Sequence, residues 1–343
     1  MKFLDVSGFG HSGKTVVADI LKEIEGYQLP NYNFEFNLIR IQGGLLDLKF
    51  ALVDNWSPIR SDSAIKRFIK LINRIGPKAS IYVPSTLFLS NGMNYDSIFK
   101  EKFTKISHDY LSSLINTTYQ GYWPYTMIDG SILEQFVARV KGQLGFSPKL
   151  VKIHLTDSSE FELKTTNYLT ALFRTIKEEN TDVFVLLNAL EPFNSEEGLN
   201  LLGDSKQIVV NRDPRDIYAS SREINTGFIP RFESNNMGLK RKIVGNTLDI
   251  FLKRHIIYHK NVVKNTPVDR VLKLNYEELI LNYEESLNKI YKFLEVCPSK
   301  HKKKGKFFDP NKSVANIGLW KNFNDKHSIA KIEESLNEFC WPK

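Results

Sequence analysis

Short, mainly apolar runs alternate with segments of helical periodicity along this chain. Runs of strand length lie at Phe3–Val6, Val183–Leu187, Gln207–Asn211 and Arg270–Leu274. Runs of this kind are typical of strands that are covered on both faces of a parallel sheet. Segments with helical spacing follow them, which predicts βαβ units. The pattern therefore predicts an α/β fold, a three-layer αβα architecture around a central, mainly parallel sheet.

The predicted helices differ in how clearly the sequence marks them. They cover about 16–25, 63–72, 132–140, 156–178, 195–202, 214–222, 240–264 and 283–294. Ser131 and Glu134 are spaced as a capping box at the start of one of them. Between about 30 and 175 the pattern is weakest. We therefore expect a single domain over 1–343 that contains a mostly helical insertion at 30–175.

The stretch Gly8-Phe-Gly-His-Ser-Gly-Lys-Thr15 lies between the first predicted strand and the first predicted helix. It fits G-x-x-x-x-G-K-[ST] at every fixed position. Glycines allow a tight turn whose N–H groups point at one anion, and the helix start adds donors and a favourable dipole. The loop therefore predicts a phosphate-bearing ligand. A glycine turn with an exposed lysine is the alternative.

Composition narrows the classes of protein without selecting one. The 343 residues carry a net charge of +8, which suits an anionic ligand, an anionic surface or nucleic acid. The densest basic block, 300–306, is interpreted first as a solvated loop, so nucleic acid is not expected as a partner. Cys297 and Cys340 predict no disulfide framework and no cysteine metal site. Without a signal-like N-terminus or a long apolar run, we expect a cytoplasmic protein with no membrane span.

A second constellation, Arg212-Asp-Pro-Arg-Asp-Ile-Tyr-Ala-Ser220, turns from a predicted strand into a helix. The arginine fork and the serine hydroxyl near the helix start can converge on one phosphate. A charged helix cap, with Asp213 and Asp216 at the positive end of the dipole, explains the same residues. On the pattern alone, both interpretations stay open.

At this point the chain resembles the sulfotransferases that use 3′-phosphoadenosine 5′-phosphosulfate (PAPS). The family pattern R-x-P-x-D-x-x-x-S is met by Arg212, Pro214, Asp216 and Ser220, and the family's S-G-x-T loop by Ser12-Gly-Lys-Thr15. Its Y-E-[DE]-L, helix-terminal F-L and G-x-W-K patterns are met at 276–279, 293–294 and 318–321. The motifs occur in the family's order, and 30–175 matches none of them.

The resemblance implies a P-loop nucleotidase-like fold and assigns roles to residues. Gly10, His11, Ser12, Gly13, Lys14 and Thr15 would hold the 5′-phosphosulfate, and Arg212 and Ser220 the 3′-phosphate. Gly318, Trp320 and Lys321 would close over the nucleotide, and Tyr276 would lie near the adenine. Trp320 and Tyr276 are also compatible with core positions. PAPS would be the donor and PAP the product, with no metal required.

One departure from the family concerns charge. Many members have a lysine or arginine directly before the S-G-x-T core, and this chain has His11 at that position. At the variable position within the core, members usually have threonine, and this chain has Lys14. Either a protonated His11 or Lys14 would then stabilise the transferring sulfonate. We favour Lys14, because histidine is mostly neutral near pH 7.

The family uses histidine or glutamate as the general base near the acceptor. Glu191 lies on the segment that leads into the R-x-P-x-D strand. His154 lies within a further predicted strand, Val151–Leu155, whose residues alternate between apolar and polar. Each is equally compatible with an ordinary surface position. Asp129 and His108 also stay candidates.

Three functions compete at this stage. A PAPS-dependent sulfotransferase explains all the motifs. A P-loop kinase or NTPase explains the loop with Lys14 and would need Asp129 for magnesium. A nucleotide- or glycan-binding protein without catalysis is the third. We expect acceptor contacts in 30–175, with a glycan, glycolipid or small hydroxylated molecule as acceptor. The acceptor's identity and the oligomeric state do not follow from the sequence.

Overall fold

The computed structural model describes residues 1–30, 34–78, 93–122, 131–147, 150–223, 248–264 and 269–341. They form two compact units. The first unit comprises Met1–Asn37, Glu178–Leu199 and Asp204–Lys343, and the second comprises Leu38–Lys177 and Asn200–Gly203. The second unit overlaps the insertion expected at 30–175. Within the described residues, no helix is both long and apolar enough to cross a bilayer.

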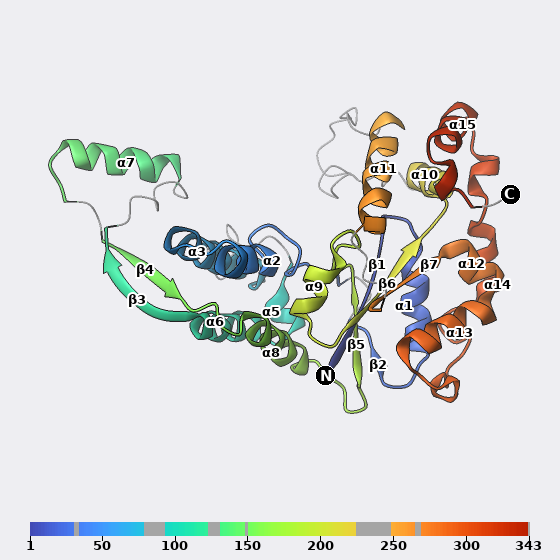
Figure 1. Cartoon of the computed structure of the whole chain (residues 1–343), viewed down its shortest axis with the longest axis horizontal. Helices are drawn as coiled ribbons and strands as arrows, with labels where there is room; N and C mark the ends of the chain where they lie inside the picture. Colours follow the sequence, from blue (N-terminus) through green and yellow to red (C-terminus); the bar gives the residue numbers. More distant parts are fainter. Residues whose placement is uncertain are drawn as a thin grey trace. The chain divides into compact units, whose positions relative to one another are not determined.

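The sheet of the first unit has five parallel strands in the order β2-β5-β1-β6-β7 (Figure 1). They are β1 (Lys2–Gly8), β2 (Tyr27–Gln28), β5 (Val183–Leu187), β6 (Lys206–Asn211) and β7 (Val271–Asn275). In the register, Val6 pairs with Leu187 on one side and with Ile208 on the other. The loops that follow these strands therefore meet at one edge of the sheet, where ligands of open parallel sheets bind.

Helices lie on both faces of this sheet. Alternate strand residues, among them Val6, Val185 and Ile208, pack against α1 (Lys14–Lys22), α12 (Tyr276–Leu281) and α13 (Tyr283–Leu294). On the opposite face, Lys273 Nζ of β7 donates to the Val262 carbonyl of α11 (Leu248–Lys264), 3.4 Å away. The predicted α/β class with a central parallel sheet is confirmed.

The first unit also contains α10 (Pro214–Glu223), α14 (Pro310–Ser313) and α15 (Lys326–Ser335), with short 3₁₀ turns at Pro298–Lys300, Val314–Asn316, Leu319–Asn322 and Asn337–Phe339. The helix α9 (Ser195–Leu201) begins in the first unit. The helix predicted over 240–264 is described from Leu248, since 240–247 lie outside the described residues.

The second unit is mostly helical. It contains α2 (Leu45–Lys49), a π-helical turn (Phe50–Asp54), α3 (Pro58–Ile75), α5 (Tyr95–Ile98), α6 (Phe103–Leu114), α7 (Ile132–Gln143) and α8 (Phe161–Arg174). Its two strands, β3 (Ile115–Gly121) and β4 (Val151–Thr156), pair antiparallel. Of these strands, only β4 was predicted.

The predicted capping box of α7 is confirmed. Ser131 Oγ accepts a hydrogen bond from the Glu134 N–H at 3.2 Å, and the Glu134 carboxylate accepts one from the Ser131 N–H at 2.7 Å. Two donors at the helix start are thereby satisfied by local sequence alone.

Candidate active site

The loop between β1 and α1 needs its glycines for packing as well as for conformation. A side chain at Gly8 would overlap Ser12 and the Val210 carbonyl, and one at Gly13 would overlap the Tyr276 ring. Gly13 also has a φ of 82°, in the left-handed region. The Ser12 N–H donates to the Phe9 carbonyl at 3.0 Å and closes the turn. Gly13 brings no capping side chain and the first turn of α1 has no acid, as suits an anion site.

Arg212 connects this loop to two distant segments. Its Nη1 donates to the His11 carbonyl at 3.0 Å and its Nη2 to the Asn316 carbonyl at 2.6 Å. Its guanidinium carbon lies 4.8 Å from the centre of the Tyr276 ring. The structure therefore brings together the glycine-rich loop, the R-x-P-x-D motif and Tyr276, whose side chain is also buried in the core of the first unit. Ser220 is half-buried, in the second turn of α10.

Two polar atoms at this junction are buried without a hydrogen-bond partner in the described chain, Ser12 Oγ and Arg212 Nε. Arg212 is only 8% exposed. Unsatisfied buried donors of this kind are costly unless a ligand pairs with them. A phosphate oxygen accepts from both a hydroxyl and a guanidinium. The residues present therefore fit a phosphate group of a ligand.

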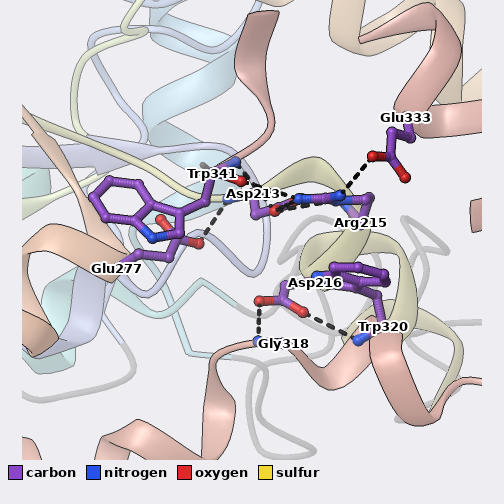
Figure 2. A network of polar contacts seen from close by, with 8 residues as sticks. All are labelled: Asp213, Arg215, Asp216, Glu277, Gly318, Trp320, Glu333 and Trp341. Carbon is purple, nitrogen blue, oxygen red and sulfur yellow. Dashed lines mark hydrogen bonds and ion pairs between the residues drawn. The ribbon is translucent and has the colours of Figure 1, made fainter. Parts of the chain in front are cut away.

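The first turn of α10 also holds the Gly318-Leu-Trp-Lys321 segment (Figure 2). The Asp216 carboxylate accepts from the Gly318 N–H at 2.8 Å and from the Trp320 N–H at 3.1 Å. Burial raises the Asp216 pKa, against the lowering effect of these two bonds. Lys321 is exposed. Asp216 thus fixes the backbone of the segment that was predicted to close over the nucleotide.

Arg215 holds the ring of Trp320 in this arrangement (Figure 2). Its guanidinium carbon lies 4.1 Å from the Trp320 ring centre, and it forms a buried ion pair with Asp213 at 2.7 Å. Arg215 also donates to the Trp341 carbonyl at 3.1 Å and lies 3.4 Å from Glu333. The residues between the fixed positions of R-x-P-x-D therefore anchor the C-terminal segment, which the motif did not reveal.

Glu277 completes the network by accepting from the Asp213 N–H at 2.8 Å (Figure 2). Burial raises its pKa to about 7. The ordinary pKa of a glutamate is 4.5, and in the folded state the pKa of Glu277 is about 7. Because the folded state holds this proton more tightly, the Glu277 carboxyl reduces the stability of the fold as the pH rises from 4.5 to about 7.

Glu277→Gln is therefore expected to raise the melting temperature more at pH 8 than at pH 5. The shift in the Glu277 pKa corresponds to roughly 3 kcal/mol at most. Thermal unfolding at both pH values measures the difference. The exposed Glu334→Gln serves as the matched control. An equal change at both pH values would contradict the titration of Glu277 in this window.

Lys14 supplies the side-chain charge of the loop. Burial lowers the His11 pKa, and the nearby Arg212 and Lys14 cations lower it further. His11 is therefore neutral at pH 7, and its backbone takes a left-handed φ of 64°. This supports the sequence-based preference for Lys14.

Glu35 is a site residue that the sequence analysis did not identify. Its Oε1 lies 3.8 Å from Lys14 Nζ and accepts from Asn188 Nδ2 at 2.7 Å. Asn188 is the first residue after β5, at the edge of the sheet where the glycine-rich loop also lies. The available sequence signal was a lone acidic residue between two phenylalanines, Phe34 and Phe36. Both phenylalanines are buried in the structure.

Of the general bases that the sequence suggested, Glu191 belongs to the first unit and His154 to the second. Glu191 is half-buried in the segment after β5. That segment is held by Asp5, which accepts from the Ala189 N–H at 2.8 Å and whose pKa burial raises to about 6. His154 lies on β4 of the second unit, where Nδ1 is 3.0 Å from Thr118 Oγ1.

His108 and Asp129 are the two remaining base candidates. His108 is exposed on α6 of the second unit. Asp129 lies outside the described residues.

Aromatic residues of α11 pack against the glycine-rich loop, which the sequence also did not reveal. Phe9 lies 4.1 Å from the His255 ring and 5.1 Å from the Tyr258 ring. Burial lowers the His255 pKa to about 3, so this histidine is neutral. Among the described residues, no cluster of histidine, cysteine and carboxylate side chains is arranged to hold a metal ion.

Comparison with known proteins matches residues 195–308 to the sulfotransferase domain family. The matched segment contains Arg212, Ser220 and Tyr276 and spans less than half of the chain. The resemblance seen in the sequence is confirmed over this segment. No curated protein sequence matches the chain.

Solved structures similar to the chain include two sulfotransferases and a retinol dehydratase. The sulfotransferase domain of the Synechococcus PCC 7002 olefin synthase is 12% identical, with 100% of this chain and 95% of that one covered and a TM-score of 0.43. The sulfotransferase STF9 from Mycobacterium avium is 11% identical, with 98% and 76% covered and a TM-score of 0.38. A retinol dehydratase in complex with androsterone and PAP is 13% identical, with 98% and 80% covered and a TM-score of 0.33.

Proposed function

We propose, from the sulfotransferase domain matched by residues 195–308, that this chain transfers a sulfonate from PAPS to a hydroxyl or amine of an acceptor. The observation that carries the proposal is the position of Arg212. It contacts the glycine-rich loop, Tyr276 and the segment before Gly318 at once. A site assembled in this way suits a ligand with phosphate groups at two positions.

The residues that would hold the donor are those that the resemblance to PAPS-dependent sulfotransferases suggests. Gly10, His11, Ser12, Gly13, Lys14 and Thr15 surround the start of α1 and would bind the 5′-phosphosulfate. Arg212 and Ser220 would bind the 3′-phosphate, and Tyr276, Gly318, Trp320 and Lys321 would surround the rest of the nucleotide. The unsatisfied Ser12 Oγ and Arg212 Nε support this assignment.

PAPS supplies an activated sulfonate, whose sulfur–oxygen bond to the nucleotide breaks as the bond to the acceptor forms. Negative charge then grows on the leaving phosphate and has to be stabilised by positive donors. Lys14 would supply that charge, because His11 is neutral at pH 7. The N–H groups at the start of α1 would assist.

The proton of the attacking group needs an acceptor. Glu35 is a carboxylate 3.8 Å from Lys14 Nζ, oriented by the Asn188 amide. Because Lys14 would lie beside the transferring sulfonate, Glu35 would lie within reach of the attacking hydroxyl or amine and take its proton. We assign the base to Glu35, with Glu191 and His154 as the alternatives that the sequence suggested.

A P-loop kinase or NTPase remains the second candidate. The observation in its favour is the complete glycine-rich loop with Lys14 at the start of α1. Its magnesium ligand would be Asp129, which lies outside the described residues.

The acceptor is proposed more broadly. The second unit, Leu38–Lys177 with Asn200–Gly203, would bind it, because the predicted nucleotide-binding residues all lie in the first unit. A glycan, glycolipid or small hydroxylated molecule fits the sequence-based expectation, with a cytoplasmic enzyme acting on it.

Thermal unfolding with nucleotides tests the proposed function. PAP without metal is expected to raise the melting temperature, because a ligand at 100 times its Kd stabilises the folded state by about 2.7 kcal/mol. ADP and ATP, each with and without magnesium, are the comparison ligands. Stabilisation by ATP with magnesium alone would overturn the sulfotransferase proposal in favour of the kinase.

A further inference from the structure

Helix α7 of the second unit carries an apolar face that the described residues leave uncovered. None of its side chains is buried. Ile132 is 87% exposed, Leu133 70% and Phe136 62%, and Leu144, directly after the helix, is 68% exposed. Isolated exposed apolar residues are common, but a contiguous set on one helix marks an interaction surface.

The apolar residues share one side of the helix. When the residues are placed around the helix axis at 100° each, six apolar side chains fall within an arc of about 140°. In order around the axis they are Ile132, Phe136, Val140, Leu133, Leu144 and Val137. Gln143 is the polar residue inside this arc. The opposite side presents Glu134, Ala138 and Gly142. The helix is therefore amphipathic, although it covers no core of its own.

The charges of α7 decide which partner fits. Arg139 and Lys141 are both exposed and lie at the two borders of the apolar arc. The helix's one acid, Glu134, is occupied by its capping bonds to Ser131. A second copy of α7 would bring further cations and no unengaged acid to these borders. An anionic bilayer surface offers a hydrocarbon layer for the apolar arc and phosphate groups for the two cations.

We propose that α7 is an interfacial helix that lies on an anionic lipid bilayer, with Leu133 and Phe136 in the acyl boundary and Arg139 and Lys141 at the headgroups. This binding does not depend on sulfonate transfer or on nucleotide binding. It would place the second unit at a membrane surface, where lipid-linked acceptors are presented.

Co-sedimentation of the full chain with vesicles tests the proposal. Binding is expected to vesicles of phosphatidylcholine with phosphatidylglycerol, and to weaken between about 0.1 M and 0.5 M salt. Leu133→Ser with Phe136→Ser is expected to lower the partition coefficient at least about tenfold. Arg139→Gln and Lys141→Gln should each lower it about fivefold on anionic vesicles only.

The matched control is Ala138→Ser on the polar side of α7, which should leave binding unchanged. Because α7 buries no side chain, all these variants are expected to keep the melting temperature of the unaltered chain. Failure of the unaltered chain to bind anionic vesicles overturns the proposal. Light scattering tests the alternative that the apolar face binds a second copy of the chain. A dimer that dissociates in the Leu133→Ser, Phe136→Ser variant would assign the face to that contact and overturn the proposal of membrane binding.

Discussion

Lys14→Ala is expected to lower the turnover of the proposed sulfonate transfer by about 10²–10³ while the chain stays folded. Lys14 is the cation at the start of α1, and the neutral His11 does not replace its charge. A donor that stabilises charge growing in the transition state acts mainly on kcat. Single-turnover rates with PAPS and an acceptor found by screening measure the effect.

Lys22→Ala on the same helix is the matched control, because Lys22 pairs with Asp19 at the far end of α1. His11→Gln is expected to change the rate much less than Lys14→Ala. An unchanged rate in Lys14→Ala would remove Lys14 from the mechanism. A large loss in His11→Gln alone would transfer the role to His11.

Glu35→Gln is expected to lower kcat by about 10²–10⁴, since it removes the proposed base but keeps an oxygen for the Asn188 amide. The affinity for PAP should change little, because the proton acceptor acts on the acceptor molecule and not on the nucleotide. Comparing kcat with the Kd for PAP separates these effects.

Glu191→Gln and His154→Gln in parallel decide between the three candidate bases. A large loss of kcat in one of them, with near-normal activity in Glu35→Gln, would assign the base there. A double-mutant cycle of Lys14→Ala and Glu35→Gln adds a direct test. The two side chains are 3.8 Å apart and would act in the same step, so the effects of the two substitutions on kcat should not be additive.

Much of the first unit could be predicted from the sequence. The runs at 183–187 and 207–211 form the predicted parallel strands, and the loop before Lys14 joins β1 to α1. The second unit was harder. Its strand β3 reads Ile-Asn-Thr-Thr-Tyr-Gln-Gly, is mostly exposed and carries little hydrophobic signal. Its pairing with β4 joins residues far apart in the sequence.

By itself the sequence determined the α/β class, the glycine-rich loop, the capping box of α7 and the order of the motifs that resemble those of sulfotransferases. These features depend on local backbone preferences and on spacing within one or two elements. Only the tertiary structure placed Glu35 beside Lys14, packed Arg215 against Trp320, and surrounded His11 with cations and protein that keep it neutral. Those outcomes arise from contacts between distant segments and from burial, which local spacing does not encode.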